Sequence, residues 1–390
     1  MDRLAAHRLD PETPFLTDPS AQRLCAVIGN AGHALYFVGG CVRNAVLGEA
    51  ASDIDMSTDA VPARVIEVLT AAKMRVIPTG IDHGTVTAVV DGQPFEITTF
   101  RRDVETDGRR AVVRFSTDIA DDARRRDFTM NALYADAAGF VHDPLGGLPD
   151  TLARRVRFIE DADRRIKEDY LRILRFFRFN AHYAPDDTDW DAEALAAIAA
   201  NLDGLDQLSA ERVGAEMLKL LSAADPVPAV SVMTQAGVLA HVLPGADPVF
   251  LGPFVQLEQL HGAAINPVSR LAALGGEDIA TRLRLSRKDQ RHLETVQSLS
   301  TTVWGPRAIG HLGGAEAGSS AVLLRAAMAI QPLEPGILAQ VQSGTDAEFP
   351  VTAADLPELS GPALGKRLKA LRHAWLTSEL TLDRAALLAA

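Results

Sequence analysis

Two aspartates separated by one residue, Asp53 and Asp55, are the residues of this chain whose types and spacing most clearly indicate chemistry. On an extended segment, residues two apart point to the same face of a sheet. Both carboxylates can therefore bind one Mg²⁺ ion, or bridge two, because Mg²⁺ prefers hard oxygen ligands. The spacing predicts that Asp53 and Asp55 are catalytic metal ligands.

A phosphate-binding turn is predicted a few residues before this pair. Gly39 and Gly40 follow a short apolar stretch, and glycine amides at the start of a helix can approach a phosphate closely. Arg43 lies one turn into that helix and can reach the same anion. A phosphate site and metal-binding carboxylates within about twenty residues of each other indicate nucleotidyl transfer.

Alternating short strands and helices must hold these groups in place. We expect a strand over 35–38, a helix over 42–47, and a second strand that carries both aspartates. An Asp-Pro pair at 18–19 starts a helix over 21–30, and a further helix covers 60–72. Strands at 85–90 and 95–100 are joined by a turn at 91–92. In the second of these strands, alternation places Glu96 on one face together with Thr98 and Phe100.

The motifs resemble a known superfamily. The apolar-Gly-Gly stretch followed by Asp-Ile-Asp is similar to the nucleotidyltransferase superfamily of DNA polymerase beta. The longer pattern GGCVRN…SDIDMSTD resembles its class II branch of tRNA CCA-adding enzymes and bacterial poly(A) polymerases. The resemblance implies a third catalytic carboxylate, for which Glu96 is in the matching position. Asn44 stands where the family usually has Asp, which leaves one local contact open.

Two further stretches carry the resemblance. Residues 101–114 are charged and turn-rich, and we expect a mobile loop that overhangs the site. Residues 124–133, RRRDFTMNAL, resemble a family motif in which Arg126 contacts the triphosphate. We expect Asp127 and Asn131 to support Arg126 from one face of a helix. A cation is required there because charge accumulates on the transferring phosphoryl oxygens.

A single helix is predicted over 161–179 from the 3.6-residue period of its apolar side chains. Asp169, Arg172, Arg175 and Arg178 recur every three residues and would share one flank of it. The stretch from Glu168 to Arg172 resembles the Glu-Asp-x-x-Arg element of CCA-adding enzymes. By that resemblance Asp169 and Arg172 read the base of the nucleotide, and Arg175 and Arg178 support it.

An aspartate beside an arginine presents a defined pattern of hydrogen-bond acceptors and donors. The carboxylate only accepts and the guanidinium only donates. Cytosine and adenine each offer an amino donor beside a ring-nitrogen acceptor, so both satisfy the pair. Uracil and guanine present the reverse arrangement, which leaves like groups facing each other at a cost of several kcal/mol. One helix could therefore select C and A without a template.

The composition is that of a globular protein rather than a membrane or disulfide-rich one. Hydrophobic residues make up 47% and charged residues 23% of the 390 residues, and there are two cysteines. No apolar run is long enough to span a bilayer, and the first residues lack the apolar core of a signal peptide, so we expect a cytoplasmic protein. The net charge is −12, but residues 101–178 carry 17 Lys and Arg against 15 Asp and Glu. Positive charge therefore gathers where a polyanion must bind.

The expected architecture is α+β: a mixed-sheet head over 1–147, a helical neck over 148–223, and a helical body and tail over 224–390 that bind tRNA. The resemblance implies addition of C, C and A to the 3′ end of tRNA from CTP and ATP, with Mg²⁺ as the cofactor and release of pyrophosphate. A poly(A) polymerase, or an enzyme that adds only CC or A, is the alternative within the class. A non-catalytic RNA-binding protein with a degenerate head is the alternative outside it. No oligomeric state is assigned.

Overall fold

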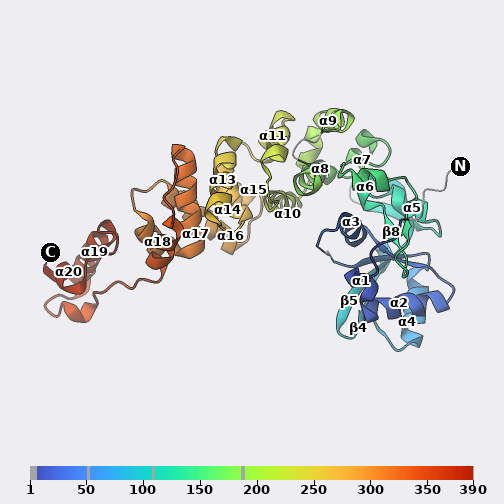
Figure 1. Ribbon diagram of the computed structural model, residues 1–390, viewed down its shortest axis with the longest axis horizontal. Helices are drawn as coiled ribbons and strands as arrows, with labels where there is room; N and C mark the ends of the chain where they lie inside the picture. Colours follow the sequence, from blue (N-terminus) through green and yellow to red (C-terminus); the bar gives the residue numbers. More distant parts are fainter. Residues whose placement is uncertain (1–6, 51–52, 108–109, 186–188, 390) are drawn as a thin grey trace. The chain divides into compact units, whose positions relative to one another are not determined.

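The computed structural model describes residues 7–50, 53–107, 110–185 and 189–389. The chain forms two compact units, Met1–Gln207 and Leu208–Ala390. The first unit contains the sheets, and the second is built from helices (Figure 1). This confirms the expected order of an α+β head followed by helical parts, while the bounds of the three domains given above stay predictions.

A seven-stranded mixed sheet is the centre of the first unit. Its spatial order is β3-β4-β5-β2-β1-β8-β9, and β2 and β5 are parallel whereas the other neighbours are antiparallel. The strands are β1 (Leu35–Val38), β2 (Asp55–Thr58), β3 (Arg75–Gly80), β4 (Thr85–Val90), β5 (Gln93–Thr99), β8 (Tyr134–Ala135) and β9 (Val141–His142). Asp55 is the first residue of β2 and Asp53 comes before it, so the expectation of one strand carrying both aspartates is wrong.

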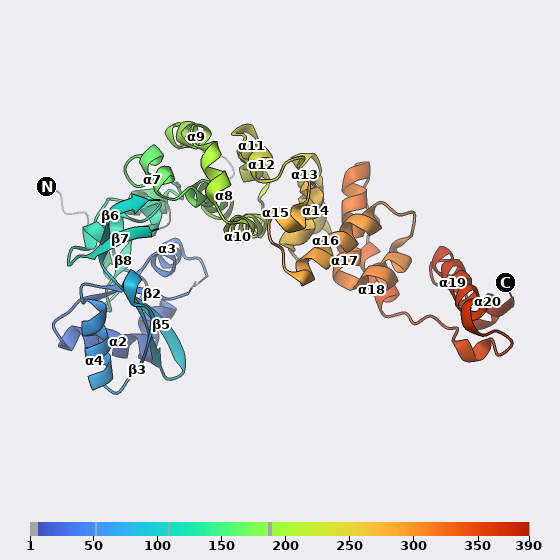
Figure 2. The same cartoon turned by 180° about the vertical axis from the view of Figure 1, so that it is seen from behind.

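The two faces of the sheet have different partners. One face carries Phe37, Met56 and Ile97, which pack with the apolar sides of α2 (Pro19–Asn30) and α4 (Pro62–Ala71) in the largest core cluster. Figure 2 shows both helices beside the sheet. On the other face, Val38 and Phe100 pack in a smaller cluster with Ala123, Ala132, Tyr134 and Ile159. Because successive side chains of a strand point to opposite faces, the polar side chains that alternate with Met56 and Ile97 lie on this second face.

The charged stretch 101–114 is a β-hairpin and not the loop that its composition predicts. Strands β6 (Arg101–Asp107) and β7 (Arg110–Phe115) pair antiparallel, with a register shift between Asp103 and Glu105. The pairing satisfies those amide and carbonyl groups of each strand that face the other strand. The two strands form a separate small sheet.

Two of the helices expected in the first unit are interrupted. The helix face expected to carry Asp127 and Asn131 is absent, because α5 ends at Arg124 and only a single 3₁₀ turn, η2 (Thr129–Asn131), follows it. The helix predicted over 161–179 is broken at Asp169 and Tyr170. The remaining helical elements of this unit are α1 (Pro14–Thr17), α3 (Gly40–Leu47), η1 (Ile81–His83), α5 (Ile119–Arg124), α6 (Leu148–Leu152), α7 (Ala162–Glu168), α8 (Leu171–Tyr183), α9 (Ala192–Ala199) and η3 (Leu202–Gln207).

The second unit contains α10 (Ala210–Leu221), α11 (Val227–Gln235), α12 (Val238–Val242), η4 (Pro248–Phe250), α13 (Leu251–His261), α14 (Pro267–Leu274), α15 (Ile279–Arg282), α16 (Arg287–Ser300), α17 (Pro306–Ala329), α18 (Ile337–Thr345), η5 (Ala353–Asp355), α19 (Gly361–Thr377) and α20 (Arg384–Ala389). Gly275 and Gly276 have positive φ, and α14 ends at the residue before them. No helix among the described residues is long and apolar enough to cross a membrane.

A buried arginine joins three helices of the second unit. Arg270 in α14 is fully buried, and its Nε atom donates to Glu258 in α13 at 2.8 Å. Its other nitrogens donate to the carbonyl oxygens of Leu221, Ala223 and Ala224, at and just beyond the end of α10. The guanidinium group thereby satisfies carbonyl groups that a helix end leaves without intrahelical partners.

Candidate active site

The three predicted catalytic carboxylates lie at the parallel pair of β2 and β5, two interior strands of the sheet. Asp55 in β2 and Glu96 in β5 are direct partners in the parallel register, so both side chains lie on the same face. Asp53 lies two residues before Asp55. Loss of water around the carboxylate raises the pKa of Asp55; the positive charge of Arg126 opposes this, and the charges of Glu96 and Asp53 add to the increase. The carboxylates are thus close enough to repel one another.

This set of oxygen donors fits a divalent cation, because a cation relieves the repulsion among the carboxylates. Among the residues that the structure describes, however, no three Asp, Glu, His or Cys side chains are close enough to form a complete metal cluster. The side chains of Asp53 and Asp55 are the predicted ligands, and Glu96 is their neighbour across the strand pair.

The Gly-Gly turn lies directly beside Arg126. Gly39 has φ 71° and ψ −124°, a conformation that favours glycine, and α3 begins at Gly40. A Cβ atom on Gly39 would be 3.4 Å from Nη1 of Arg126. The amides of the first turn of α3 have no intrahelical acceptors, so they and Arg126 can bind the same anion.

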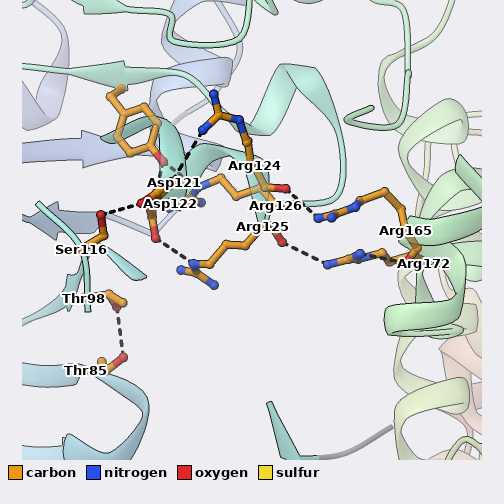
Figure 3. Close-up of polar contacts among 11 residues, drawn as sticks. Thr85, Thr98, Ser116, Asp121, Asp122, Arg124, Arg125, Arg126, Arg165 and Arg172 are labelled. Carbon is orange, nitrogen blue, oxygen red and sulfur yellow. Dashed lines mark hydrogen bonds and ion pairs between the residues drawn. The ribbon is translucent and has the colours of Figure 1, made fainter. Parts of the chain in front are cut away.

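Arg126 is held by a carboxylate that sequence reasoning missed. Asp122 in α5 is fully buried; its Oδ2 atom accepts from Nη2 of Arg126 at 3.0 Å and from the Tyr134 hydroxyl at 2.8 Å (Figure 3). The Tyr134 hydroxyl also accepts from Nε of Arg126 at 3.2 Å. Burial acts to raise the pKa of Asp122, but the guanidinium groups of Arg126 and Arg125 outweigh it and hold the pKa at about 2. The i,i+4 spacing of Asp122 and Arg126 was the signal that could have revealed the pair.

Arg43 lies in a different polar network from the one predicted. Its guanidinium group is buried and donates to Asn131 at 2.5 Å, to the Tyr183 hydroxyl at 2.6 Å, and to the side-chain oxygen of Asn44. The Asn44 amide in turn donates to the carbonyl oxygen of Ala50 at 2.7 Å. All three nitrogens of Arg43 are engaged, which leaves its predicted contact with a phosphate without support. The amide of Asn44 suits this place because Asp could not donate to Ala50.

Asp127 and Asn131 are paired as predicted but not on a helix. Nδ2 of Asn131 donates to Oδ1 of Asp127 at 2.9 Å across the turn between them. Oδ2 of Asp127 is 2.6 Å from Nη2 of Arg175 in α8, so Asp127 binds Arg175 instead of supporting Arg126. The turn replaces the expected helix because Thr129 is held by Asp150 and by the carbonyl group of Arg157.

The segment predicted to read the base consists of two helices. Asp169 has extended backbone angles after the end of α7, and its carboxylate accepts from the Leu171 amide at 3.1 Å. Such a local hydrogen bond competes with a continuous helix. Asp169 and Arg172 are therefore not one turn apart on one helix, which corrects the geometry assumed above. Arg172 and Arg178 do share a partly exposed flank of α8, together with Arg175.

Arg172 is fixed by three acceptors. Its Nη1 atom donates to Glu168 at 2.7 Å and to the carbonyl oxygen of Arg165 at 2.8 Å, and its Nη2 atom donates to the carbonyl oxygen of Arg125 at 3.0 Å. Figure 3 shows the last of these contacts, at the end of α5. Arg172 and the triphosphate candidate Arg126 are therefore connected through the backbone of Arg125.

We expect Gly39→Ala to weaken nucleotide binding in addition to stability. The positive φ costs about 1–3 kcal/mol with any side chain, and a backbone shift that relieves this strain would displace the turn in which the new Cβ atom touches Arg126. The KM for nucleotide should rise several-fold, measured by steady-state incorporation alongside urea unfolding. Gly92→Ala is the matched control, because Gly92 also has positive φ but nothing within 4 Å of its Cβ position. An unchanged KM in Gly39→Ala would contradict the role of this turn.

Paired carboxylates on neighbouring strands, a glycine turn at a helix start and a fixed arginine are the features of a nucleotidyltransferase. Comparison with known proteins agrees: residues 35–157 match the poly A polymerase head domain, and residues 190–250 match a probable RNA- and SrmB-binding site of polymerase A. The chain is 31% identical to CCA tRNA nucleotidyltransferase 1, mitochondrial, of Mus musculus over 97% of this chain and 91% of the mouse protein.

Two further likenesses extend over nearly the whole chain. The CCA-adding enzyme of Levilactobacillus brevis is 32% identical over 95% of this chain and 96% of its own length. The crystal structure of the Bacillus stearothermophilus CCA-adding enzyme in complex with CTP matches with a TM-score of 0.73 at 28% identity, over 93% of this chain and 94% of that one. The chain belongs to the family of CCA tRNA nucleotidyltransferases, the CCA-adding enzymes.

Proposed function

We propose that this protein adds C, C and A, in that order and without a template, to the 3′ end of tRNA, using CTP and ATP and releasing pyrophosphate. The observation that carries the proposal is that Asp55 faces Glu96 across the β2–β5 pair and is close enough to Arg126 to feel its charge, while Gly39 lies beside the same Arg126. Membership of the CCA-adding family supports the choice of substrates. The cytoplasmic location expected from the sequence belongs to the proposal.

We assign Mg²⁺ to the carboxylates as part of the proposal. Asp53 and Asp55 would hold it, with Glu96 beside them, and the ion would supply charge neutralisation for the terminal hydroxyl and the phosphates. The chain's own groups have separate tasks. The amides after Gly39 and the guanidinium group of Arg126 bind and orient the triphosphate, and they stabilise the charge that develops on pyrophosphate as it leaves.

Base selection is assigned to Asp169 and Arg172, with Arg175 and Arg178 as supporting residues. A carboxylate that accepts and a guanidinium that donates suit cytosine and adenine and disfavour uracil and guanine. Three partners hold Arg172 in one orientation, which supports a recognition role because a fixed donor discriminates better than a mobile one.

Incubation with a tRNA that lacks its last three residues tests the proposal. With CTP alone we expect two residues to be added, with CTP and ATP together three, and with UTP or GTP none, as read on a sequencing gel. A long A-tail with ATP alone would indicate a poly(A) polymerase, and arrest after two C residues would indicate a CC-adding enzyme. Binding of tRNA without incorporation would favour a non-catalytic RNA-binding protein.

A further inference from the structure

Arg165 is a buried arginine to which none of the steps above assigns a role. It lies in α7 with 4% of its surface exposed. Its Nη1 atom donates to the carbonyl oxygen of Arg124 at 2.6 Å, and its Nη2 atom is 2.7 Å from Oε1 of Glu168. One guanidinium group thus joins the end of α5 to the carboxylate that precedes Asp169.

Arg165 is connected to Arg172 in two ways. Its side chain shares Glu168 with Arg172, whose Nη1 atom is 2.7 Å from Oε2. Its backbone carbonyl oxygen accepts from the same Nη1 atom at 2.8 Å. Each oxygen of Glu168 therefore has its own guanidinium partner, and the carboxylate is held between the two arginines.

The guanidinium groups of Arg165 and Arg172 both contact the short segment at the end of α5. Arg165 and Arg172 donate to consecutive carbonyl groups, those of Arg124 and Arg125, as Figure 3 shows. A helix end leaves such carbonyl groups without intrahelical partners and carries partial negative charge, so two guanidinium groups are well placed there. The next residue is Arg126, which is paired with Asp122.

We propose that Arg165 is a positioning residue for base selection: by occupying Oε1 of Glu168 and the carbonyl group of Arg124, it fixes Arg172 at a set distance from the triphosphate-binding Arg126. This inference rests on the proposed function. Without Arg165, Oε1 of Glu168 keeps only the outer contact with the exposed Arg164 and becomes available to Arg172, and a two-bond ion pair is the preferred geometry of a carboxylate with a guanidinium. Such a pair turns Arg172 toward Glu168 and away from Arg125, so its donors no longer match cytosine or adenine.

The test compares Arg165→Met, Arg165→Lys and Arg164→Met in the full chain. Arg164 is the matched control, because it forms an outer contact of 3.5 Å with the same Glu168 while its side chain is 68% exposed. The readout is kcat/KM for CTP and for UTP on the same shortened tRNA. We expect Arg165→Met to lower the CTP-to-UTP ratio at least about tenfold, mainly through the KM for CTP. Arg165→Lys should restore part of the CTP-to-UTP ratio. Its ammonium group keeps the positive charge but cannot reproduce the geometry of both guanidinium contacts, with Glu168 and with the carbonyl group of Arg124.

A proportional loss with both nucleotides, leaving the ratio of wild type, would overturn the inference and show that Arg165 acts only in folding. The inference also fails if Arg164→Met lowers the ratio as much as Arg165→Met does. If thermal melting shows that Arg165→Met is unfolded, the ratio in Arg165→Lys decides between the two outcomes. Failure of the proposed function looks different, because wild type itself would then not incorporate from CTP and ATP.

Discussion

Replacing Asp55 by Asn is expected to lower nucleotide incorporation on the order of 10³-fold or more, which is typical for loss of a group acting at the reacting atoms. The same variant should melt at a higher temperature than wild type when divalent cations are removed. The pKa of Asp55 is raised in the folded protein, chiefly by loss of water around the carboxylate. The folded state therefore holds the proton more tightly than the unfolded chain, and the stability that this contributes is lost as the pH rises through the folded pKa. At neutral pH the ionised carboxylate is a net cost to folding, which Asn removes.

The two readouts are single-turnover incorporation with Mg²⁺ and thermal melting in EDTA. Glu67→Gln is the control, because Glu67 is an exposed acidic residue of α4, the helix that packs on the opposite face of the sheet. It should change neither quantity, and tRNA binding should be retained in both variants. Asp53→Ala is expected to lose activity to a similar extent. Incorporation at the wild-type rate by Asp55→Asn would refute the assignment of the carboxylates.

Replacing Arg270 by Met is expected to destabilise the second unit by about 3–5 kcal/mol, because removal of one partner leaves Glu258 as an uncompensated buried charge. Three carbonyl groups at the end of α10 lose a donor as well. Adding Glu258→Leu should therefore recover only part of the loss.

The destabilisation should depend on pH. Burial raises the pKa of Glu258 while Arg270 lowers it, so without Arg270 the pKa rises further. A protonated Glu258 costs little to bury, and the deficit relative to wild type should shrink from about pH 8 to about pH 5. Urea unfolding at both values measures it. Arg325→Met is the comparison, because Arg325 donates to the carbonyl oxygens of Thr302 and Trp304. Its substitution should lower the free energy of unfolding by less than Arg270→Met does. A pH-independent deficit in Arg270→Met would contradict this account of Glu258.

The sequence predicted those parts of the site that depend on residues close together in the chain. The Asp-x-Asp spacing and the Gly-Gly turn before a helix are local patterns, and the structure has them at the start of β2 and after the end of β1. The pairing of Glu96 with Asp55 depends on a parallel register between distant strands, which alternation cannot specify; only the resemblance indicated it. The roles of these residues remain proposals.

The wrong helix prediction over 161–179 has a physical origin. The periodic spacing of apolar side chains indicates which residues are buried, but it does not show that the backbone is one continuous helix. Ile166 and Ile173 are both buried on either side of the break at Asp169, so the period continues across it. The available signal for the break was Asp169, because an Asp side chain can bind nearby backbone amides in place of the helical hydrogen bonds. In the charged hairpin the apolar alternation of strands was too weak to oppose a loop interpretation. Arg165 was missed because a buried arginine in a charged helix resembles its solvated neighbours.

The parallel pairing of β2 with β5 also has a consequence for how the protein is made. Asp55 and Glu96 are about 40 residues apart, with β3 and β4 between them, so the row of carboxylates forms only after a long segment has emerged and closed on itself. A nascent chain that ends before β5 already contains both aspartates but not the neighbour that faces Asp55 across the strand pair. On the roles proposed above, the carboxylate set is therefore completed only when β5 has been made and has paired with β2, and not when the aspartates leave the ribosome.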